Sequence, residues 1–146
     1  MNDYKIFLLL AVAFICSKPL FCQVSHQNFE FEYHDIRYTG RLELTKQKAK
    51  GLIVLIPGHG PTDFVEGEDY RELRNAFTES GFTVCFWDKA GCGKSEGVYD
   101  HNQSIENSAK EALAAISKIK RLNVPGSDQI GLWGISRAGW ICPLII

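Results

Sequence analysis

A single serine near the end of this chain stands in a setting that could support nucleophilic chemistry. Ser136 follows the apolar run of residues 130–133 and a glycine, Gly134, and a small residue, Ala138, comes two positions after it. We interpret this order as a strand, a sharp turn and the start of a helix, because small residues are required where the two backbones approach closely. Such a turn would hold the Ser136 hydroxyl clear of a sheet and direct the backbone N–H of Arg137 toward the same space.

A loop rich in glycine and proline, residues 57–61, is the second candidate for chemistry. It follows residues 51–56, a continuous and largely β-branched run that is typical of a strand covered on both faces of a parallel sheet. Open α/β sheets bind their ligands at the carboxyl ends of the strands, which is where this loop would lie. The loop carries one histidine, His59, and it offers backbone N–H donors at every position except its prolines.

The turn around Ser136 resembles the G-x-S-x-G nucleophile elbow of the α/β-hydrolase family, with Ala138 in place of the second glycine. The loop at 57–61 is similar to the loop that supplies the family's second oxyanion donor. The resemblance implies that Ser136 is the nucleophile and that the backbone N–H groups of Arg137 and His59 form the oxyanion hole. The structural alternative is that the serine serves only as a helix N-cap.

The register of the 57–61 loop leaves further interpretations open. Many family members carry a histidine where this chain has Pro57, and a shift by one residue would make Gly60 the donor in place of His59. Alternatively the loop, shaped by Gly58 and Gly60, is a tight turn without a catalytic part. We do not expect the His59 side chain to act as general base, because the family places that histidine beyond its last strand.

Residues 88–95 nearly match a phosphate-binding loop, but the match fails at its first position. Asp88 stands where that loop needs a glycine, and its carboxylate would repel phosphate groups, so we expect no nucleotide. The stretch instead resembles the D-x-R-G-x-G-x-S segment of the hydrolases, with Ala90 in place of the arginine. The resemblance implies that Asp88, Gly91 and Gly93 shape a structural loop at the edge of the site.

Periodicity indicates the elements that position these loops. Residues 29–33 and 38–44 alternate apolar and polar side chains, which predicts an antiparallel hairpin with one buried face. Residues 69–80 predict a helix with its N-cap at Asp69, and residues 82–87 predict the next strand. A strand, a helix and a second strand in this order imply a right-handed crossover and parallel pairing.

A long helix is predicted before the strand that leads to the serine. Its capping residues fall within residues 100–103, and its last turn is rich in basic side chains, which the helix macrodipole favours. One face of this helix is apolar at helical spacing. The residues of that face are Ile105, Ala109, Ala112, Leu113, Ile116 and Ile119.

Taken in order, these elements match the N-terminal portion of an α/β-hydrolase fold. We predict an α/β fold with a mostly parallel sheet, an N-terminal hairpin and helices on both faces. The resemblance places the acid and the histidine of a catalytic triad after the nucleophile, whereas the sequence ends ten residues after Ser136. We therefore expect residues 23–146 to be a partial α/β-hydrolase domain, truncated after the elbow and inactive without that acid and base.

Residues 1–22 are predicted to be a signal peptide. Residues 6–16 are continuously apolar, a length too short for a stable membrane span and typical of a signal-peptide core. We expect export to the periplasm or the extracellular space, with cleavage near Cys22 or Gln23 and no stable membrane span in the mature chain. A buried N-terminal helix is the alternative.

The net charge and the cysteine spacing argue against nucleic acid, metal ions and disulfide bonds. A net charge of −1 gives no basic surface for nucleic acid. The five cysteines contain no C-x-x-C pair and have no metal-like spacing with the four histidines. We therefore expect no metal, no other cofactor and no disulfide framework.

The sequence thus predicts an exported serine hydrolase that acts on carboxylic ester or related acyl bonds. Its substrate would be a small-molecule acyl ester or a peptide. Two alternatives stay open, a serine peptidase of the aminopeptidase or dipeptidyl type and a non-catalytic secreted protein that keeps the scaffold for binding. The individual substrate is not predicted, because the family builds its acyl pocket and lid largely from later segments.

Overall fold

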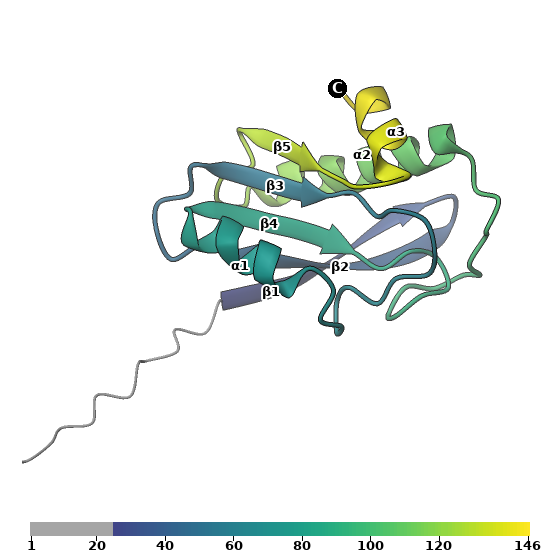
Figure 1. Cartoon of the computed structure of the whole chain (residues 1–146), viewed down its shortest axis with the longest axis horizontal. Coiled ribbons are helices and arrows are strands. Elements are labelled where there is room, and N and C mark those ends of the chain that lie inside the picture. Colours follow the sequence, from purple (N-terminus) through teal and green to yellow (C-terminus); the bar gives the residue numbers. More distant parts are fainter. Residues whose placement is uncertain (1–24) are drawn as a thin grey trace, which may run out of the picture.

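A five-stranded mixed sheet is the frame of residues 25–146, the part of the chain that the computed structural model describes (Figure 1). The strands are β1 (Ser25–Tyr33), β2 (Ile36–Leu44), β3 (Gly51–Leu55), β4 (Phe82–Trp87) and β5 (Ile130–Trp133). They lie in the order β1-β2-β4-β3-β5. β2 pairs antiparallel with β1 and β4, whereas β3 pairs parallel with β4 and β5. The predicted α/β fold, with an N-terminal hairpin and a parallel core, is confirmed.

β1 and β2 form the predicted hairpin, and each strand begins before its alternating pattern does. His34 and Asp35 join the strands with φ of 51° and 59°, the positive values that a two-residue type I′ turn requires at both positions. β2 lies close to β4 at Gly40, where a Cβ would come within 2.9 Å of the Phe86 carbonyl oxygen. The hairpin therefore reaches the parallel part of the sheet through a position that needs glycine.

Alternate side chains of the strands build one apolar cluster on each face of the sheet. The helices that cover these clusters are α1 (Arg71–Glu79), α2 (Ile105–Leu122), α3 (Ala138–Ile141) and the short 3-10 helix η1 (Cys142–Leu144). β4 contributes Cys85 and Trp87 to the cluster that contains α2 and α3, and Val84 and Phe86 to the cluster on the α1 side. Helices thus lie on both faces, as predicted (Figure 1).

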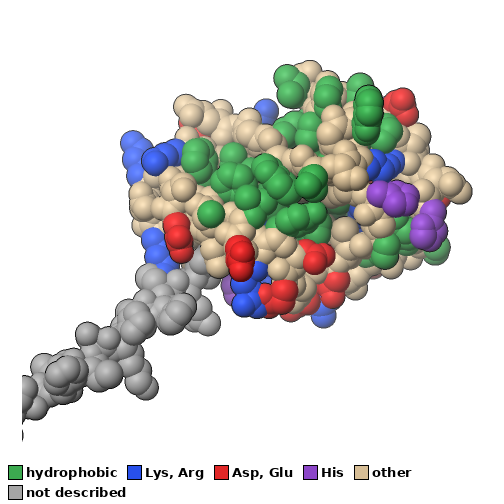
Figure 2. Space-filling view, viewed as in Figure 1, with side chains coloured by type: hydrophobic (Ala, Val, Ile, Leu, Met, Phe, Trp, Pro, Cys, Tyr) green, Lys and Arg blue, Asp and Glu red, His purple; other side chains and the backbone are tan. Residues whose placement is uncertain are grey.

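The α1 face of the sheet is only partly covered. Ile53, Phe77 and Trp133 pack against the cluster on this face but stay partly exposed. Figure 2 shows apolar side chains gathered on the same face. This cluster is therefore open to solvent on one side in the described part of the chain.

The start of α1 differs from the prediction. The predicted N-cap was Asp69, but α1 begins at Arg71 and its N-cap is Tyr70, which has φ of 55° and no capping side chain. The Tyr70 ring lies 5.8 Å from that of Phe64 and 5.2 Å from that of Trp133, measured between centroids. These aromatic contacts fix how the chain enters the helix, and they outweigh the local capping preference.

The start and the buried face of α2 also differ from the prediction. Its N-cap is Ser104, not a residue of 100–103, and the Ser104 Oγ accepts the Asn107 N–H at 3.1 Å. Leu113, predicted on the apolar face, is 43% exposed, whereas Glu111 is only 4% exposed. The buried Trp87 Nε1–H and the half-buried Gln103 side-chain amide donate to the Glu111 carboxylate, and these bonds stabilise Glu111 on the inner face of α2.

No helix within residues 25–146 has the length and apolar character needed to cross a membrane. The predicted signal peptide, residues 1–22, lies outside the described residues. Export and the boundary of the mature domain at residue 23 therefore stay predictions from the sequence.

Replacing Ser104 by alanine should lower the free energy of unfolding by about 0.5 to 2 kcal/mol, because the Asn107 N–H loses its capping acceptor. Ser117→Ala, at an exposed position of α2, is the matched control and should change that free energy by less than about 0.5 kcal/mol. Urea unfolding of the protein measures both. Equal losses in the two variants would contradict the assignment of Ser104 as the cap.

Candidate active site

Ser136 occupies a strained turn directly after β5. Its φ is 59°, a left-handed conformation that costs a residue with a Cβ about 1 to 3 kcal/mol and is enriched at active sites. The side chain is exposed. Hydrogen bonding within the turn begins with the Ala138 N–H, which donates to the Ile135 carbonyl at 3.2 Å. The Arg137 N–H precedes this first bond, so it stays available to a ligand at the same turn.

The close approach of strand and helix at this turn limits side-chain size. A Cβ added to Gly134 would lie 2.5 Å from the Cβ of Ala138, and 3.3 Å from the Sγ of Cys142. Ala138 itself is fully buried. A larger side chain at Gly134 or Ala138 would force β5 and α3 apart and relax the backbone at Ser136.

The loop at 57–61 lies beside this turn. The Ile56 N–H donates to the Trp133 carbonyl at 2.8 Å, so the carboxyl ends of β3 and β5 are held together. A Cβ at Gly58 would lie 3.3 Å from the carbonyl oxygen of Ile135. Ile135 is the residue immediately before Ser136. The structure thus brings the predicted oxyanion loop and the predicted nucleophile to one edge of the sheet.

The two glycines of the loop flank an exposed histidine. Gly60 has φ of 93°, a backbone conformation that favours glycine, and Gly58 lies close to the serine turn. The His59 side chain between them is exposed. Within residues 25–146, no side-chain hydrogen bond connects the Ser136 hydroxyl to a histidine.

Asp88 binds the loops that follow β3 and β4. Its Oδ1 accepts the N–H groups of Phe64 and Val65 at 2.7 Å and 3.0 Å, and its Oδ2 accepts the Lys94 N–H at 3.0 Å. Burial raises the pKa of the Asp88 carboxyl, and these backbone N–H bonds lower it, with burial the larger effect. The carboxylate holds two loops in place and has no exposed face for substrate, because the side chain is fully buried.

The glycines after Asp88 allow the loop to close around it. A Cβ at Gly93 would lie 2.2 Å from the Asp88 Oδ2, and a Cβ at Gly91 would lie 2.4 Å from the Tyr99 nitrogen. Both glycines have positive φ, 48° at Gly93 and 68° at Gly91. The backbone therefore passes too close to its neighbours to carry a side chain at either position.

Sequence reasoning missed Lys89, which follows Asp88. The Lys89 side chain is buried, and its Nζ donates to the carbonyl oxygens of Gly58 and Gly60 at 2.5 Å and 2.6 Å. Burial lowers the pKa of this amine, and the nearby Arg137 guanidinium lowers it further. No local pattern in the sequence indicates these contacts, because Lys89 and its partners belong to different loops.

A partly buried polar cluster around the Arg137 side chain was also missed. The Arg137 guanidinium donates to the Ser108 Oγ at 3.0 Å and to the Gln103 carbonyl. The Glu111 carboxylate accepts the Trp87 Nε1–H at 2.7 Å and the Gln103 Nε2–H at 3.0 Å. Ser108 and Glu111 lie three residues apart and therefore on the same side of α2. Two polar residues beside the apolar face of this helix are the signal that could have revealed the cluster.

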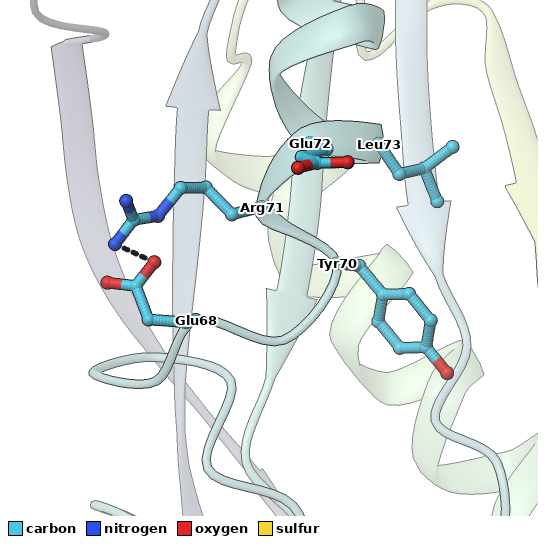
Figure 3. Close-up of a pocket in the computed structure, with 5 residues that line it drawn as sticks. All are labelled: Glu68, Tyr70, Arg71, Glu72 and Leu73. Atoms are coloured by element: carbon cyan, nitrogen blue, oxygen red, sulfur yellow. Dashed lines mark ion pairs between the residues drawn. The ribbon is translucent and has the colours of Figure 1, made fainter.

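A surface hollow at the start of α1 does not involve the predicted site residues. It is lined by Glu68, Tyr70, Arg71, Glu72 and Leu73 (Figure 3). Arg71 forms an exposed ion pair with Glu68, and the Tyr70 ring points to the other side of the helix start. Within residues 25–146, no group of three or more His, Cys, Asp or Glu side chains is placed to hold a metal ion.

Comparison with known proteins gives a family match over most of the chain. The model of the Hydrolase_4 family, described as serine aminopeptidase S33, matches residues 47–144. A characterised fungal relative, the acyltransferase drtE of Aspergillus calidoustus, is 26% identical over 117 residues, which cover 80% of this chain and 37% of the relative. The chain thus spans little more than a third of that relative's length.

Solved structures show the same fold. The α/β-hydrolase GrgF from Penicillium matches with a TM-score of 0.63 and 24% identity, over 77% of this chain and 38% of that one. The esterase Pf2001 from Pyrococcus furiosus matches with a TM-score of 0.65 and 18% identity, over 81% of this chain and 44% of that one. At these identities the likeness shows the fold alone.

Asp88→Asn should lower the free energy of unfolding by about 1 to 3 kcal/mol. The amide NH₂ of the asparagine would face a backbone N–H that now donates a hydrogen bond to the carboxylate, so that N–H would lose its acceptor. Asp128→Asn, at an exposed position, is the matched control and should leave the unfolding midpoint unchanged. Urea unfolding of the protein measures both. If Asp88→Asn unfolds at the same urea concentration as the control, Asp88 does not hold these loops.

Proposed function

Because the chain belongs to the serine aminopeptidase S33 family of α/β-hydrolases, we propose that it carries the nucleophile of a serine hydrolase that acts on carboxylic ester or related acyl bonds. The observation that carries this proposal is the left-handed backbone of Ser136, φ 59°, at an exposed turn between β5 and α3. Strain of this kind is retained where function needs it. The hydroxyl stands at the carboxyl edge of the parallel strands, where α/β folds bind their ligands.

In the proposed mechanism, the Ser136 Oγ attacks the carbonyl carbon of the acyl substrate. The oxygen that becomes negatively charged is bound by the backbone N–H groups of His59 and Arg137, one from each neighbouring loop. The alcohol then leaves and an acyl-serine remains, which water hydrolyses to release the acid. Gly58 and Gly134 support this arrangement because they let the two loops lie close together.

In this mechanism a general base must take the Ser136 hydroxyl proton and donate it to the oxygen of the leaving alcohol. A serine hydroxyl without an adjacent base is a poor nucleophile at neutral pH. The chain spans 37% to 44% of the length of the three proteins compared above. We propose that the histidine and its carboxylate partner come from residues outside this sequence, and that the 146-residue polypeptide alone hydrolyses esters slowly.

Acyl transfer to an acceptor other than water is the second candidate function. The fungal relative is an acyltransferase by name, and hydrolases and acyltransferases of this mechanism share the acyl-serine intermediate. A peptidase of the aminopeptidase or dipeptidyl type, or a secreted binding protein without activity, remains the alternative outcome. We propose that the substrate is a small acyl ester and that the protein acts after export, with residues 1–22 as its signal peptide.

A fluorophosphonate should label Ser136 in the full-length protein, because only an activated serine reacts with it. Ser136→Ala should abolish the labelling and lower kcat/KM for a p-nitrophenyl ester by at least about 10³-fold. Intact-protein mass spectrometry and ester hydrolysis measure these effects, with Ser117→Ala as the matched control. Labelling that persists in Ser136→Ala would contradict the proposed nucleophile, and no labelling in the wild type would favour the binding protein.

The acyl bond can be identified with the same protein. We expect kcat/KM for p-nitrophenyl esters to exceed that for aminoacyl and dipeptidyl p-nitroanilides. If water is the normal acceptor of the acyl group, adding an alcohol acceptor should not change the rate at which the ester releases p-nitrophenol. A higher rate on the anilides would identify a peptidase, and release of p-nitrophenol that depends on the alcohol would identify an acyltransferase.

A further inference from the structure

Lys89 lies behind the loop that carries His59 and contacts main-chain oxygens on both sides of that residue. Its side chain is buried, and its Nζ donates to the carbonyl of Gly58 at 2.5 Å and to that of Gly60 at 2.6 Å. These two carbonyls stand immediately before and immediately after His59 in the loop. Two of the three donors of the ammonium are thus used on one short segment.

The contact with Gly58 determines the direction of a neighbouring donor. The Gly58 carbonyl and the His59 N–H belong to the same planar peptide unit, and every described peptide bond is trans. In a trans unit the C=O and the N–H point in opposite directions. Because the carbonyl points to the buried ammonium, the His59 N–H points away from that ammonium. Both His59 and Ser136 are exposed.

We propose that Lys89 is a positioning residue that directs the His59 backbone N–H toward the oxyanion. This inference rests on the proposed function, since it gives that N–H a donor role at Ser136. Lys89 touches no substrate atom and acts through the peptide unit of Gly58 and His59. The ammonium also polarises this peptide unit, which strengthens its N–H as a hydrogen-bond donor to a negative oxygen.

The surroundings of Lys89 keep its ammonium in place. Its backbone N–H donates to the Thr62 Oγ1 at 3.3 Å, and its Nζ lies 5.6 Å from the centroid of the Tyr99 ring. Trp87, Glu111 and Arg137 line the small space beside it. Residues from several different elements therefore hold the Lys89 side chain in one position. Such a fixed position is expected of a residue that orients a neighbouring peptide unit.

The kinetic test compares Lys89→Met with Lys110→Met in the full-length protein. Methionine keeps most of the apolar length of the side chain and removes the donors, whereas Lys110 is exposed on α2 and serves as the matched control. We expect Lys89→Met to lower kcat about 10- to 100-fold and to change KM less than about threefold, because the oxyanion donor is misaligned while substrate binding is kept. An unchanged kcat, or a loss confined to KM, would overturn the proposal.

Two NMR measurements separate this inference from the proposed function. The His59 amide ¹H and ¹⁵N resonances should shift in Lys89→Met and stay unchanged in Lys110→Met, whether or not the protein hydrolyses esters. If the wild type shows neither activity nor labelling, the proposed function fails and the amide shift still decides whether Lys89 fixes the loop. Amide resonances that stay unchanged in Lys89→Met would overturn the inference.

A measurement on the wild type remains decisive if Lys89→Met does not fold. An ammonium held by two carbonyls should exchange its protons slowly and show scalar coupling to the carbonyl carbons of Gly58 and Gly60. The exposed Lys110 ammonium is the internal reference. Exchange at Lys89 as fast as at Lys110, with no coupling, would show that the ammonium does not hold the loop.

Discussion

The close approach of β5 and α3 is the constraint on which the rest of the site depends. A Cβ at Gly134 would lie 2.5 Å from that of Ala138, so the two backbones lie too close together for a side chain at Gly134. The turn leaves Ser136 with φ of 59°, at a cost of about 1 to 3 kcal/mol. Burial of Ala138 and Ile141 against the sheet offsets this cost and keeps the serine turn from relaxing.

Buried polar groups hold the neighbouring loops at the same edge of the sheet. Asp88 accepts backbone N–H groups from two loops, and Lys89, the next residue, donates to backbone carbonyls of the loop around His59. Of these two adjacent side chains, the carboxylate of Asp88 thus binds backbone N–H groups, and the ammonium of Lys89 binds backbone carbonyl oxygens. The apolar strands determine where each loop begins, and these polar contacts determine how it lies beside Ser136. This division explains how two adjacent residues after β4 fix both the loop that follows β3 and the loop that follows β4.

The fold could be predicted because its strands carry local signals. The two hairpin strands alternate apolar and polar side chains, and the parallel strands are apolar runs that are followed by glycine, proline or aspartate. Parallel pairing then places Ser136 and residues 57–61 at one edge without knowledge of any side-chain contact. The helix starts at Tyr70 and Ser104 were not predicted, since aromatic packing or a single better cap outweighs weaker local preferences. Lys89 was missed because its partners are distant in the sequence, and no spacing rule connects an ammonium to carbonyls of another loop.

The proposal as a whole requires one serine to face two backbone donors from separate loops. The crystal structure of the full-length protein after reaction with a fluorophosphonate tests this most directly. We predict phosphorus bonded to the Ser136 Oγ, with one phosphonyl oxygen about 2.7 to 3.1 Å from the backbone nitrogens of His59 and Arg137. Phosphorus on another side chain, or a phosphonyl oxygen that contacts neither nitrogen, would contradict the proposed arrangement.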